Sequence, residues 1–382
     1  MRERGETTAA HTGVLRIGNK QLETPKRALH LTPDRLSESS VVRFQKGRGL
    51  NEIYRTIDKD DLTRISSDTK AQEHFNAQIQ NVLSKVSEKE INLVFYTFDN
   101  ASEDENSIVR LPNANQTEYL ADLTYSFGDA VIPPILVGQS AKDYLVFLKK
   151  YFEIINGLDQ KPVFGLIPYC SHFELRPLLD FYRKSSVNLF IMDLLGRHPT
   201  LLPQNIVMTL RAMRSIQSDS GEDCYLHGLN VGFGRALPQN PIAPAKDMMS
   251  WVAGFDSFGG SHVPLKVRPD LLPFRGTRPA VRLFVRKDYG YCRSDSPLMD
   301  DTEESSLSVS LSDVRQALTY PTAKKLQRAY NAERQAVEAE SIASTIRQGK
   351  SLKGFLDSKT HVQNELRKVS QMVADLSIPT LD

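Results

Sequence analysis

Cysteine is scarce in this chain. The sequence of 382 residues contains three cysteines, Cys170, Cys224 and Cys292, which lie far apart and form no Cys-x-x-Cys pair. An odd and widely spaced set indicates neither a disulfide framework nor a zinc ribbon. We therefore expect a reduced protein of the cytoplasm.

Long apolar runs are missing as well. No stretch approaches the roughly 18 apolar residues that a membrane span requires. The polar beginning, MRERGETTAAHTG, does not contain the apolar core of a secretory signal. We expect a soluble protein without a membrane partner.

Neither sign of charge dominates. The 48 Lys and Arg residues against 46 Asp and Glu residues leave a net charge of +2. A nucleic-acid partner would therefore be held by a local basic patch rather than by the overall field. A hydrophobic content of 40% and a charged content of 25% are ordinary for a globular chain, and the length suffices for one large domain or two smaller ones.

What is present is a regular alternation of helices and strands. The patterns predict a hairpin around a Gly-Asn turn at residues 13–25, a helix at 68–88 and a buried strand at 91–98. Five further helix–strand pairs follow: 115–127 with 130–137, 141–156 with 162–168, 172–185 with 187–194, 203–217 with 224–231, and 243–253 with 255–258. Strands that alternate with helices of this length predict βαβ units and a parallel sheet.

These units predict an α/β fold, a TIM-type (β/α)8 barrel with additional C-terminal helices. A doubly wound open sheet is the alternative, which the lack of a Gly-x-Gly-x-x-Gly after the first strand disfavours. We expect a disordered tail at residues 1–12, the barrel at 13–293 and an acidic, Ser-rich linker at 294–312. Residues 313–382, with helices at 321–347 and 351–375, would pack on the barrel or mediate self-association.

In a parallel barrel, functional side chains gather at the carboxyl ends of the strands. Asp99 and Asp256 stand beside two such ends, where two carboxylates can divide the work of nucleophile and general acid–base. The alternative is that each caps a helix or braces a loop. Asp193 lies within an apolar run, and a buried carboxylate needs a partner and is often functional.

Other polar residues at strand ends are candidates for substrate binding. They comprise Tyr169, His172, Ser257 and His262, together with the Gly-rich segment Gly232, Gly234 and Arg235, whose backbone N–H groups and guanidinium suit a phosphate. The alternative is a turn that requires unusual dihedral angles. The spacing of the His and Cys residues does not indicate a metal site.

A late stretch interleaves basic and aromatic residues, as a surface that tracks a nucleic-acid backbone does. An ordinary solvated strand and loop would show the same composition. Its basic members are Lys266, Arg268, Arg275, Arg278, Arg282, Arg286 and Lys287.

Several segments carry a resemblance to a known family. HTGVLRIGNKQLETP at residues 11–25 resembles the opening hairpin of the tRNA-guanine transglycosylases, and WVAGFDSF at 251–258 resembles their Gly-x-Asp-x-Phe approach to the nucleophile strand. Segments 126–134, 163–182 and 331–356 agree with further parts of the family in the same order. The resemblance spans most of the chain and implies a barrel.

The resemblance also implies a reaction. The family exchanges a guanine in nucleic acid for a 7-deazaguanine base such as preQ0, through an Asp that attacks the ribose anomeric carbon and a second Asp that acts as acid and base. For this chain it implies tRNA or DNA as partner, Asp256 as nucleophile and Asp99 as acid–base. A homodimer or a related partner subunit is a further expectation.

The sequence departs from the family pattern at several places. Aligned without gaps, Asp256 matches the preceding Asp of the family and Gly259 takes the nucleophile position, whereas a two-residue shift makes Asp256 the nucleophile. Pro168 replaces a base-contacting Gln, and Ile135 replaces a base-recognising Asp. The family's zinc-binding Cys-x-Cys-x-x-Cys…His set is missing, so we expect no cofactor. A catalytically silent partner or nucleic-acid-binding protein, and an unrelated barrel enzyme acting on a small phosphorylated substrate, are the alternatives.

Overall fold

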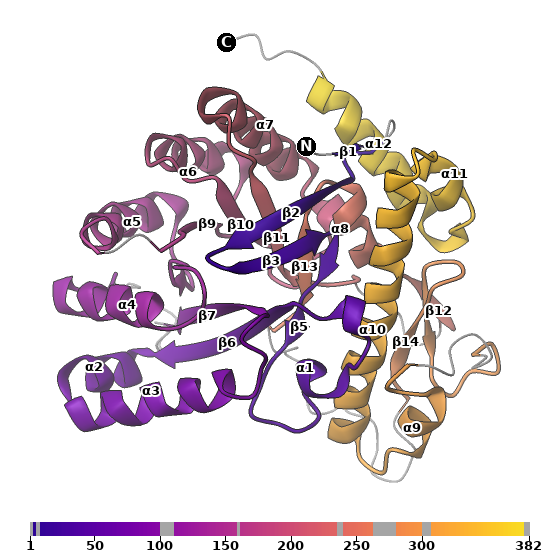
Figure 1. The fold of residues 1–382 in the computed structure, drawn as a ribbon, viewed down its shortest axis with the longest axis horizontal. Coiled ribbons are helices and arrows are strands. Elements are labelled where there is room, and N and C mark those ends of the chain that lie inside the picture. The colour runs from indigo at the N-terminus through magenta and orange to yellow at the C-terminus, as the bar shows by residue number, and fades with distance from the viewer. Residues whose placement is uncertain are drawn as a thin grey trace.

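A computed structural model describes residues 3–4, 8–99, 111–158, 161–234, 240–262, 280–299 and 307–377. Two parallel sheets form its centre, with the strand orders β4–β13–β11–β10–β9 and β5–β6–β7–β8 (Figure 1). Their strands are Lys26–Arg27 (β4), Leu29–His30 (β5), Leu50–Asp58 (β6), Ile91–Asp99 (β7), Ile135–Leu136 (β8), Phe164–Ile167 (β9), Leu189–Asp193 (β10), Tyr225–Val231 (β11) and Ser257–Gly260 (β13).

The two sheets are connected at both margins. On one side β4 and β5 are separated by a single residue, Ala28, whose N–H donates to Phe258 O. On the other side an isolated parallel bridge pairs Val131, just before β8, with Val163, just before β9. This mixed α/β architecture with parallel sheets is compatible with a TIM-like fold.

Helices follow the strands and lie around them (Figure 1). They are Lys59–Ser67 (α2), Thr69–Leu83 (α3), Ala114–Ser126 (α4), Ala141–Ile155 (α5), His172–Lys184 (α6), Pro203–Ser220 (α7) and Met249–Val252 (α8). Their beginnings follow from local chemistry, because Asn113 and Ser140 accept hydrogen bonds from the first turns of α4 and α5. At the other end of α7, Gly221 adopts the left-handed conformation that stops a helix.

Two smaller sheets and a helical group surround the parallel strands. The first sheet is antiparallel and comprises Glu3–Arg4 (β1), His11–Ile17 (β2) and Lys20–Thr24 (β3), and the second comprises Ile242–Pro244 (β12), Arg282–Val285 (β14) and Gly290–Arg293 (β15). The remaining helices are Glu38–Val41 (α1), Leu311–Gln316 (α9), Tyr320–Arg347 (α10), Leu352–Asp357 (α11) and Gln363–Ser377 (α12). Short 3-10 helices cover Gln45–Gly47, Pro199–Leu201, Lys246–Met248 and Thr360–Val362.

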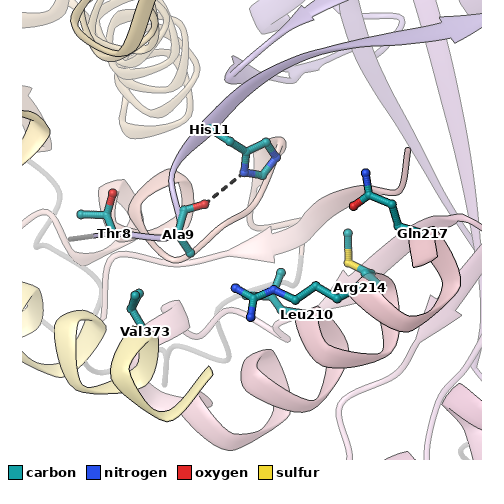
Figure 2. Close-up of a pocket in the computed structure, with 8 residues that line it drawn as sticks. Thr8, Ala9, His11, Leu210, Arg214, Gln217 and Val373 are labelled. Carbon is teal, nitrogen blue, oxygen red and sulfur yellow. Dashed lines mark hydrogen bonds between the residues drawn. The ribbon is translucent and has the colours of Figure 1, made fainter. Parts of the chain in front are cut away.

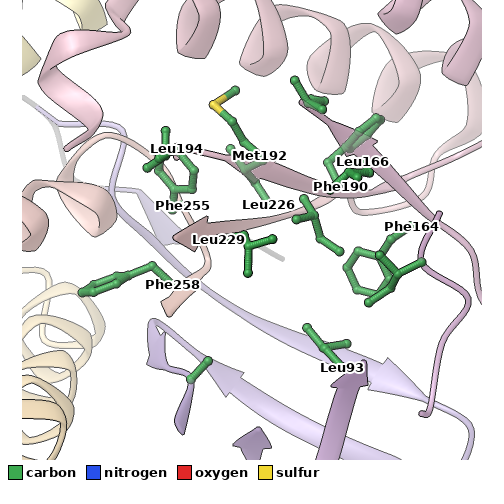
Figure 3. Close-up of a cluster of buried hydrophobic side chains, with 14 of the residues drawn as sticks. Leu93, Phe164, Leu166, Phe190, Met192, Leu194, Leu226, Leu229, Phe255 and Phe258 are labelled. Atoms are coloured by element: carbon green, nitrogen blue, oxygen red, sulfur yellow. The ribbon is translucent and has the colours of Figure 1, made fainter. Parts of the chain in front are cut away.

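The main core lies between the strands and the helices around them. Phe164, Phe190, Leu226 and Phe258 are among its fully buried members, and side chains from neighbouring strands meet there (Figure 3). Burying one such side chain contributes about 1.5–3 kcal/mol. The long helix α10 packs against β14, β4 and β2. No helix in the described residues combines the length and the apolar character needed to cross a bilayer.

The structure corrects several predicted boundaries. Residues 8–12 are not a disordered tail, because Ala9 N–H donates to Val252 O at 3.1 Å and β2 already begins at His11. Parts of the predicted linker are packed, since Val309 is buried. The first residues of the predicted helix 243–253 belong to β12, because a proline such as Pro244 is disfavoured inside a helix.

Two further predictions on element type were incomplete. The predicted helix 351–375 is divided into α11 and α12 at Lys359, whose buried ammonium donates to Arg286 O. Strand β6 was not predicted at all, because the polar residues Asn51, Glu52 and Arg55 interrupt its apolar pattern.

Candidate active site

Glu52 lies in β6, and its side chain is completely buried in the space between the parallel strands. Its Oε1 accepts a hydrogen bond from His227 Nε2 at 2.7 Å, and its Oε2 accepts one from His262 Nε2 at 2.5 Å. Because an ionised carboxylate only accepts hydrogen bonds, both imidazoles must carry a proton on Nε2. We call Glu52, His227 and His262 with their hydrogen-bonded partners Ser257 and Tyr225 the Glu52 cluster.

The charge of Glu52 is set by its neighbours. Burial alone would raise its pKa, but the hydrogen bonds from His227 and His262 outweigh that effect and bring the pKa of this carboxyl well below its usual value. Glu52 is therefore ionised at neutral pH. A buried carboxylate with both oxygens bonded is what a low-dielectric interior tolerates.

The cluster continues below His227. Its Nδ1 accepts a hydrogen bond from Ser257 Oγ at 2.7 Å, and Ser257 Oγ accepts one from Tyr225 OH at 2.5 Å. Ser, His and Glu in this order have the connectivity of a hydrolytic triad. However, Ser257, His227 and Glu52 are each 0% exposed, so no substrate reaches the hydroxyl. We conclude that this half of the cluster supports Glu52 and is not a nucleophile.

His262 forms the other end of the cluster. Its side chain is 2% exposed, stacks on the Tyr54 ring at a centroid distance of 4.8 Å and meets the edge of His30 at 4.3 Å. These two rings and Glu52 fix the plane of the imidazole. His262 Nδ1 is buried and has no hydrogen-bond partner among the described residues.

Asp193 is joined to His262 through Asn230. Asp193 Oδ1 accepts hydrogen bonds from Asn230 Nδ2 and from Leu195 N, both at 2.9 Å, and Asn230 Oδ1 accepts one from His262 N at 2.9 Å. Asn230 itself has φ of +55°, an uncommon conformation for a residue with a side chain. Asp193 is the last residue of β10, and His262 follows β13, so both lie at the carboxyl ends of the parallel strands.

Burial raises the pKa of Asp193, while the hydrogen bonds from Asn230 and Leu195 act in the opposite direction. Both of these hydrogen bonds end on Oδ1. Within the described residues no hydrogen bond to Oδ2 is found.

Gly259 lies against Glu52. A Cβ added at Gly259 would overlap the Glu52 carboxylate, so a side chain and this carboxylate cannot share the space. Position 259 is where a gap-free comparison with the transglycosylases places the nucleophile. In this chain a carboxylate from β6 fills the volume that a side chain from β13 would need.

Asp256 lies at the opposite end of the parallel strands. It precedes β13, where Oδ1 accepts a hydrogen bond from His11 Nε2 at 2.8 Å and Oδ2 accepts one from Leu226 N at 2.8 Å. His11 lines a cavity of about 70 Å³ and donates through Nδ1 to Ala9 O (Figure 2). Both ring nitrogens of His11 thus face oxygen acceptors, which indicates an imidazolium paired with Asp256.

Asp99, the other predicted catalytic residue, ends β7 in register with Asp58 of β6. β13 runs parallel to β4, and β5, which continues β4 after Ala28, runs parallel to β6 and β7 through its pairing with β6, so the end of β7 and the start of β13 lie at opposite ends of the parallel strands. The structure therefore does not bring Asp99 and Asp256 together. A second cavity of about 350 Å³ beside Asp256 is lined by the hairpin strand β2 and the starts of β10 and β11, again at the amino ends.

Residues predicted to bind substrate are spread over the rim. Tyr169 is 43% exposed, and the Arg197 guanidinium lies 4.0 Å from its ring centroid. His172 begins α6, and its ring lies 3.9 Å from that of Phe173, which is 81% exposed. These side chains form an aromatic margin that follows the end of β9.

The glycine segment after β11 differs from a phosphate-binding loop. Gly232 N–H donates to Arg197 O at 2.9 Å, and a Cβ at Gly232 would overlap Gly196 O. This N–H is therefore used within the protein, and the glycine permits a close approach of two loops. Gly234 has φ of +92° and lies beside His198, and Arg235 lies outside the described residues.

The predicted basic stretch is described only in part. Arg282 donates to the carbonyls of Tyr291 and Asn240, and Arg286 pairs with Glu338 at 3.0 Å. Lys287 is exposed. Lys266, Arg268, Arg275 and Arg278 lie outside the described residues.

The described residues contain no group of three or more His, Cys, Asp or Glu side chains arranged to hold a metal ion. No disulfide joins the three cysteines: Cys224 and Cys292 are buried, and Cys170 is partly buried. That the protein uses no cofactor stays a prediction from the sequence.

Sequence reasoning missed three members of the site, Glu52, Tyr54 and His30. All three lie on β5 or β6, where the segment LNEIYRTID does not have a clear strand period. A signal was nevertheless present, because Glu and Tyr two residues apart lie on the same face of a strand. Recognising β6 would have directed both side chains toward the site.

Comparisons with known proteins give little guidance. No protein-family model matches the chain, and no curated protein matches it significantly. A glucosidase from Croceicoccus marinus is similar over 66% of this chain and 60% of its own, with 12% identity and a TM-score of 0.39. A variant of the carboxyl transferase domain of Rhizobium etli pyruvate carboxylase with pyruvate is similar over 92% and 62%, with 9% identity and a TM-score of 0.37. The chain thus spans about three fifths of the length of each of these two structures.

Proposed function

We propose that the protein is a transglycosylase-like enzyme that exchanges a guanine in tRNA or DNA for a 7-deazaguanine base, and that its strands close into a TIM-type barrel. With β4 and β5 counted as one strand, an eight-stranded cycle is supported by the pairings from β13 through β4 and β5 to β6, and by the bridge from Val131 to Val163. The substrate would enter at the carboxyl ends of the strands, as in barrel enzymes generally.

One observation carries the assignment of the site. Asp193, whose Oδ2 receives no hydrogen bond from the described residues, is joined through Asn230 to the segment that bears His262. A carboxylate that attacks an anomeric carbon needs one unblocked oxygen and a neighbour that exchanges a proton with the base. We therefore place the nucleophile at Asp193.

This proposal moves the chemistry away from the residues that the sequence favoured. Asp256 has both carboxylate oxygens bonded at the amino ends, next to His11 and Leu226, which suits a bracing role for the hairpin. Asp99 ends β7, so it stays at a carboxyl end, on the side from which substrate would enter.

The test is incorporation of labelled guanine or preQ0 into tRNA and into duplex DNA. We expect Asp193→Asn to abolish incorporation and the denaturation-resistant adduct between protein and nucleic acid. Asp247→Asn is the matched control, since Asp247 is also a buried aspartate whose pKa burial raises, but it is bonded to Tyr291 and Gln335. Full incorporation by Asp193→Asn would refute Asp193 as nucleophile.

One observation favours a second function. Gly259 supplies no side chain at the position that the resemblance gives to the nucleophile, as in a catalytically silent partner or nucleic-acid-binding protein. Wild-type protein that binds nucleic acid in a salt-dependent manner, yet neither exchanges base nor forms an adduct, would establish this function instead. Absence of such binding would favour a barrel enzyme for a small phosphorylated substrate.

A further inference from the structure

The Glu52 cluster has a polarity that the sequence does not reveal. The carboxylate of Glu52 receives one hydrogen bond from His262 Nε2, so this imidazole in its neutral form carries its lone pair on Nδ1. That nitrogen is buried and unpartnered among the described residues. A buried acceptor without a partner costs about 1–3 kcal/mol, so a merely structural histidine would be expected to satisfy it.

We propose that His262 is the catalytic acid–base of the exchange and that Glu52 is the positioning residue that holds it in that role; this inference rests on the function proposed above. Carboxylate, imidazole and free ring nitrogen have the connectivity in which an acidic residue fixes the tautomer of a general base. Tyr54 stacks on one face of the ring and His30 meets its edge, so the direction of Nδ1 is fixed.

The proton balance follows from two half-reactions. In the first, Asp193 Oδ2 bonds to the anomeric carbon, the bond from that carbon to the departing guanine breaks, and protonated His262 gives its Nδ1 proton to the base. In the second, a ring nitrogen of the incoming base bonds to the anomeric carbon and the bond from that carbon to Asp193 breaks. Neutral His262 takes the N–H proton that this nitrogen loses. The imidazolium present between turnovers is paired with the Glu52 carboxylate.

The contacts of His227, Ser257 and Tyr225 explain why Glu52 is suited to this task. His227 occupies Oε1, and Ser257 and Tyr225 hold His227 with its Nε2 proton toward Glu52. Glu52 therefore presents only Oε2 to His262. A carboxylate fixed on both oxygens cannot rotate to approach Nδ1, so Glu52 leaves the proton-accepting nitrogen unoccupied.

The first arm of the test needs no substrate. Side-chain nitrogen NMR of the full chain labelled with ¹⁵N-histidine should show that the neutral imidazole of His262 carries its proton on Nε2 and leaves Nδ1 unprotonated, with its signals identified by their loss in His262→Gln. Ser257→Ala should change the signals of His227 and leave this tautomer of His262 unaltered. A neutral His262 that carries its proton on Nδ1 would overturn the proposal, whatever the protein's activity.

The second arm measures turnover with labelled guanine. His262→Ala should lower kcat about 100- to 10,000-fold, and added imidazole should restore part of the rate, which a purely structural role would not allow. Glu52→Gln should lower kcat far more than it changes KM, while Glu333→Gln, a buried glutamate bonded to Ser308, should turn over normally. Wild-type rates in His262→Ala, or no rescue by imidazole, would overturn the proposal while the exchange by the parent protein stands. If the parent does not exchange base, the proposed function fails, and the NMR arm still decides the geometry of His262 and Glu52.

Discussion

Replacement of Asp256 separates a structural role from a catalytic one. Its side chain is 2% exposed and that of its partner His11 is 6% exposed, so the pair is buried. Asp256→Ala would leave the imidazolium of His11 without a counter-charge and Leu226 N–H without an acceptor. Breaking a buried pair by removing one partner costs about 3–5 kcal/mol.

Asp256→Asn should be much milder. The asparagine oxygen can still accept from Leu226 N–H, and its amide can donate to Nε2 of a neutral His11 that keeps its hydrogen bond to Ala9 O. What is lost is the difference between charge-assisted and neutral hydrogen bonds, about 1–2 kcal/mol. The two variants should therefore differ from each other by about 1–4 kcal/mol.

Urea unfolding followed by circular dichroism at pH 7 measures both losses. Asp180→Ala, on the exposed face of α6, is the control and should stay within about 0.5 kcal/mol of the parent. A double variant with His11→Ala should recover part of the loss, because the unpaired imidazolium is then gone. If Asp256→Ala unfolds like the parent but no longer exchanges base, Asp256 acts on the substrate and our reasoning is wrong.

Three further outcomes can be stated. Because burial raises the pKa of Asp193, the ionised form of this side chain lowers the folding stability above that pKa. Asp193→Asn should therefore raise the urea midpoint at pH 7. This gain in the midpoint should vanish as pH falls through the pKa of Asp193. Gly259→Ala should lower the free energy of unfolding by about 1–3 kcal/mol because it displaces Glu52. Gly354→Ala on α11 has open space around it and should raise the free energy of unfolding by about 0.5–1 kcal/mol. Equal urea midpoints for the two variants would contradict the clash at Gly259. Burial raises the pKa of Cys170 to about 11, so only about one thousandth of it is thiolate at pH 8 and iodoacetamide should label it slowly, which mass spectrometry can follow.

The sequence predicted the α/β rhythm well because helix and strand periods are local properties. α4, α5 and α6 begin and end within a residue or so of the predicted ranges, and their caps are visible in the sequence as Asn113, Ser140 and Ser171. β6 escaped because its inward-facing side chains serve the site rather than the core. A strand that carries Glu and Tyr toward a polar interior lacks the apolar alternation by which strands are found.

The site was harder to predict because its contacts join distant parts of the chain. His227 and His262 were both visible beside strand ends, but their shared partner, Glu52, lies 175 and 210 residues away. Asp256 was favoured from a short motif, and the motif alone does not say at which end of the parallel strands the carboxylate lies. A shift of one or two residues at the start of β13 decides between the amino end and the interior.

The overlap of Gly259 with Glu52 has a consequence for how such chains can diverge. A carboxylate on β13 at position 259 and a glutamate on β6 at position 52 exclude each other sterically. Relatives of this protein should therefore fall into two groups, with glycine opposite a long acidic residue, or a larger residue opposite a small one. A change at either position alone would be selected against, so the two groups would be separated by a paired replacement.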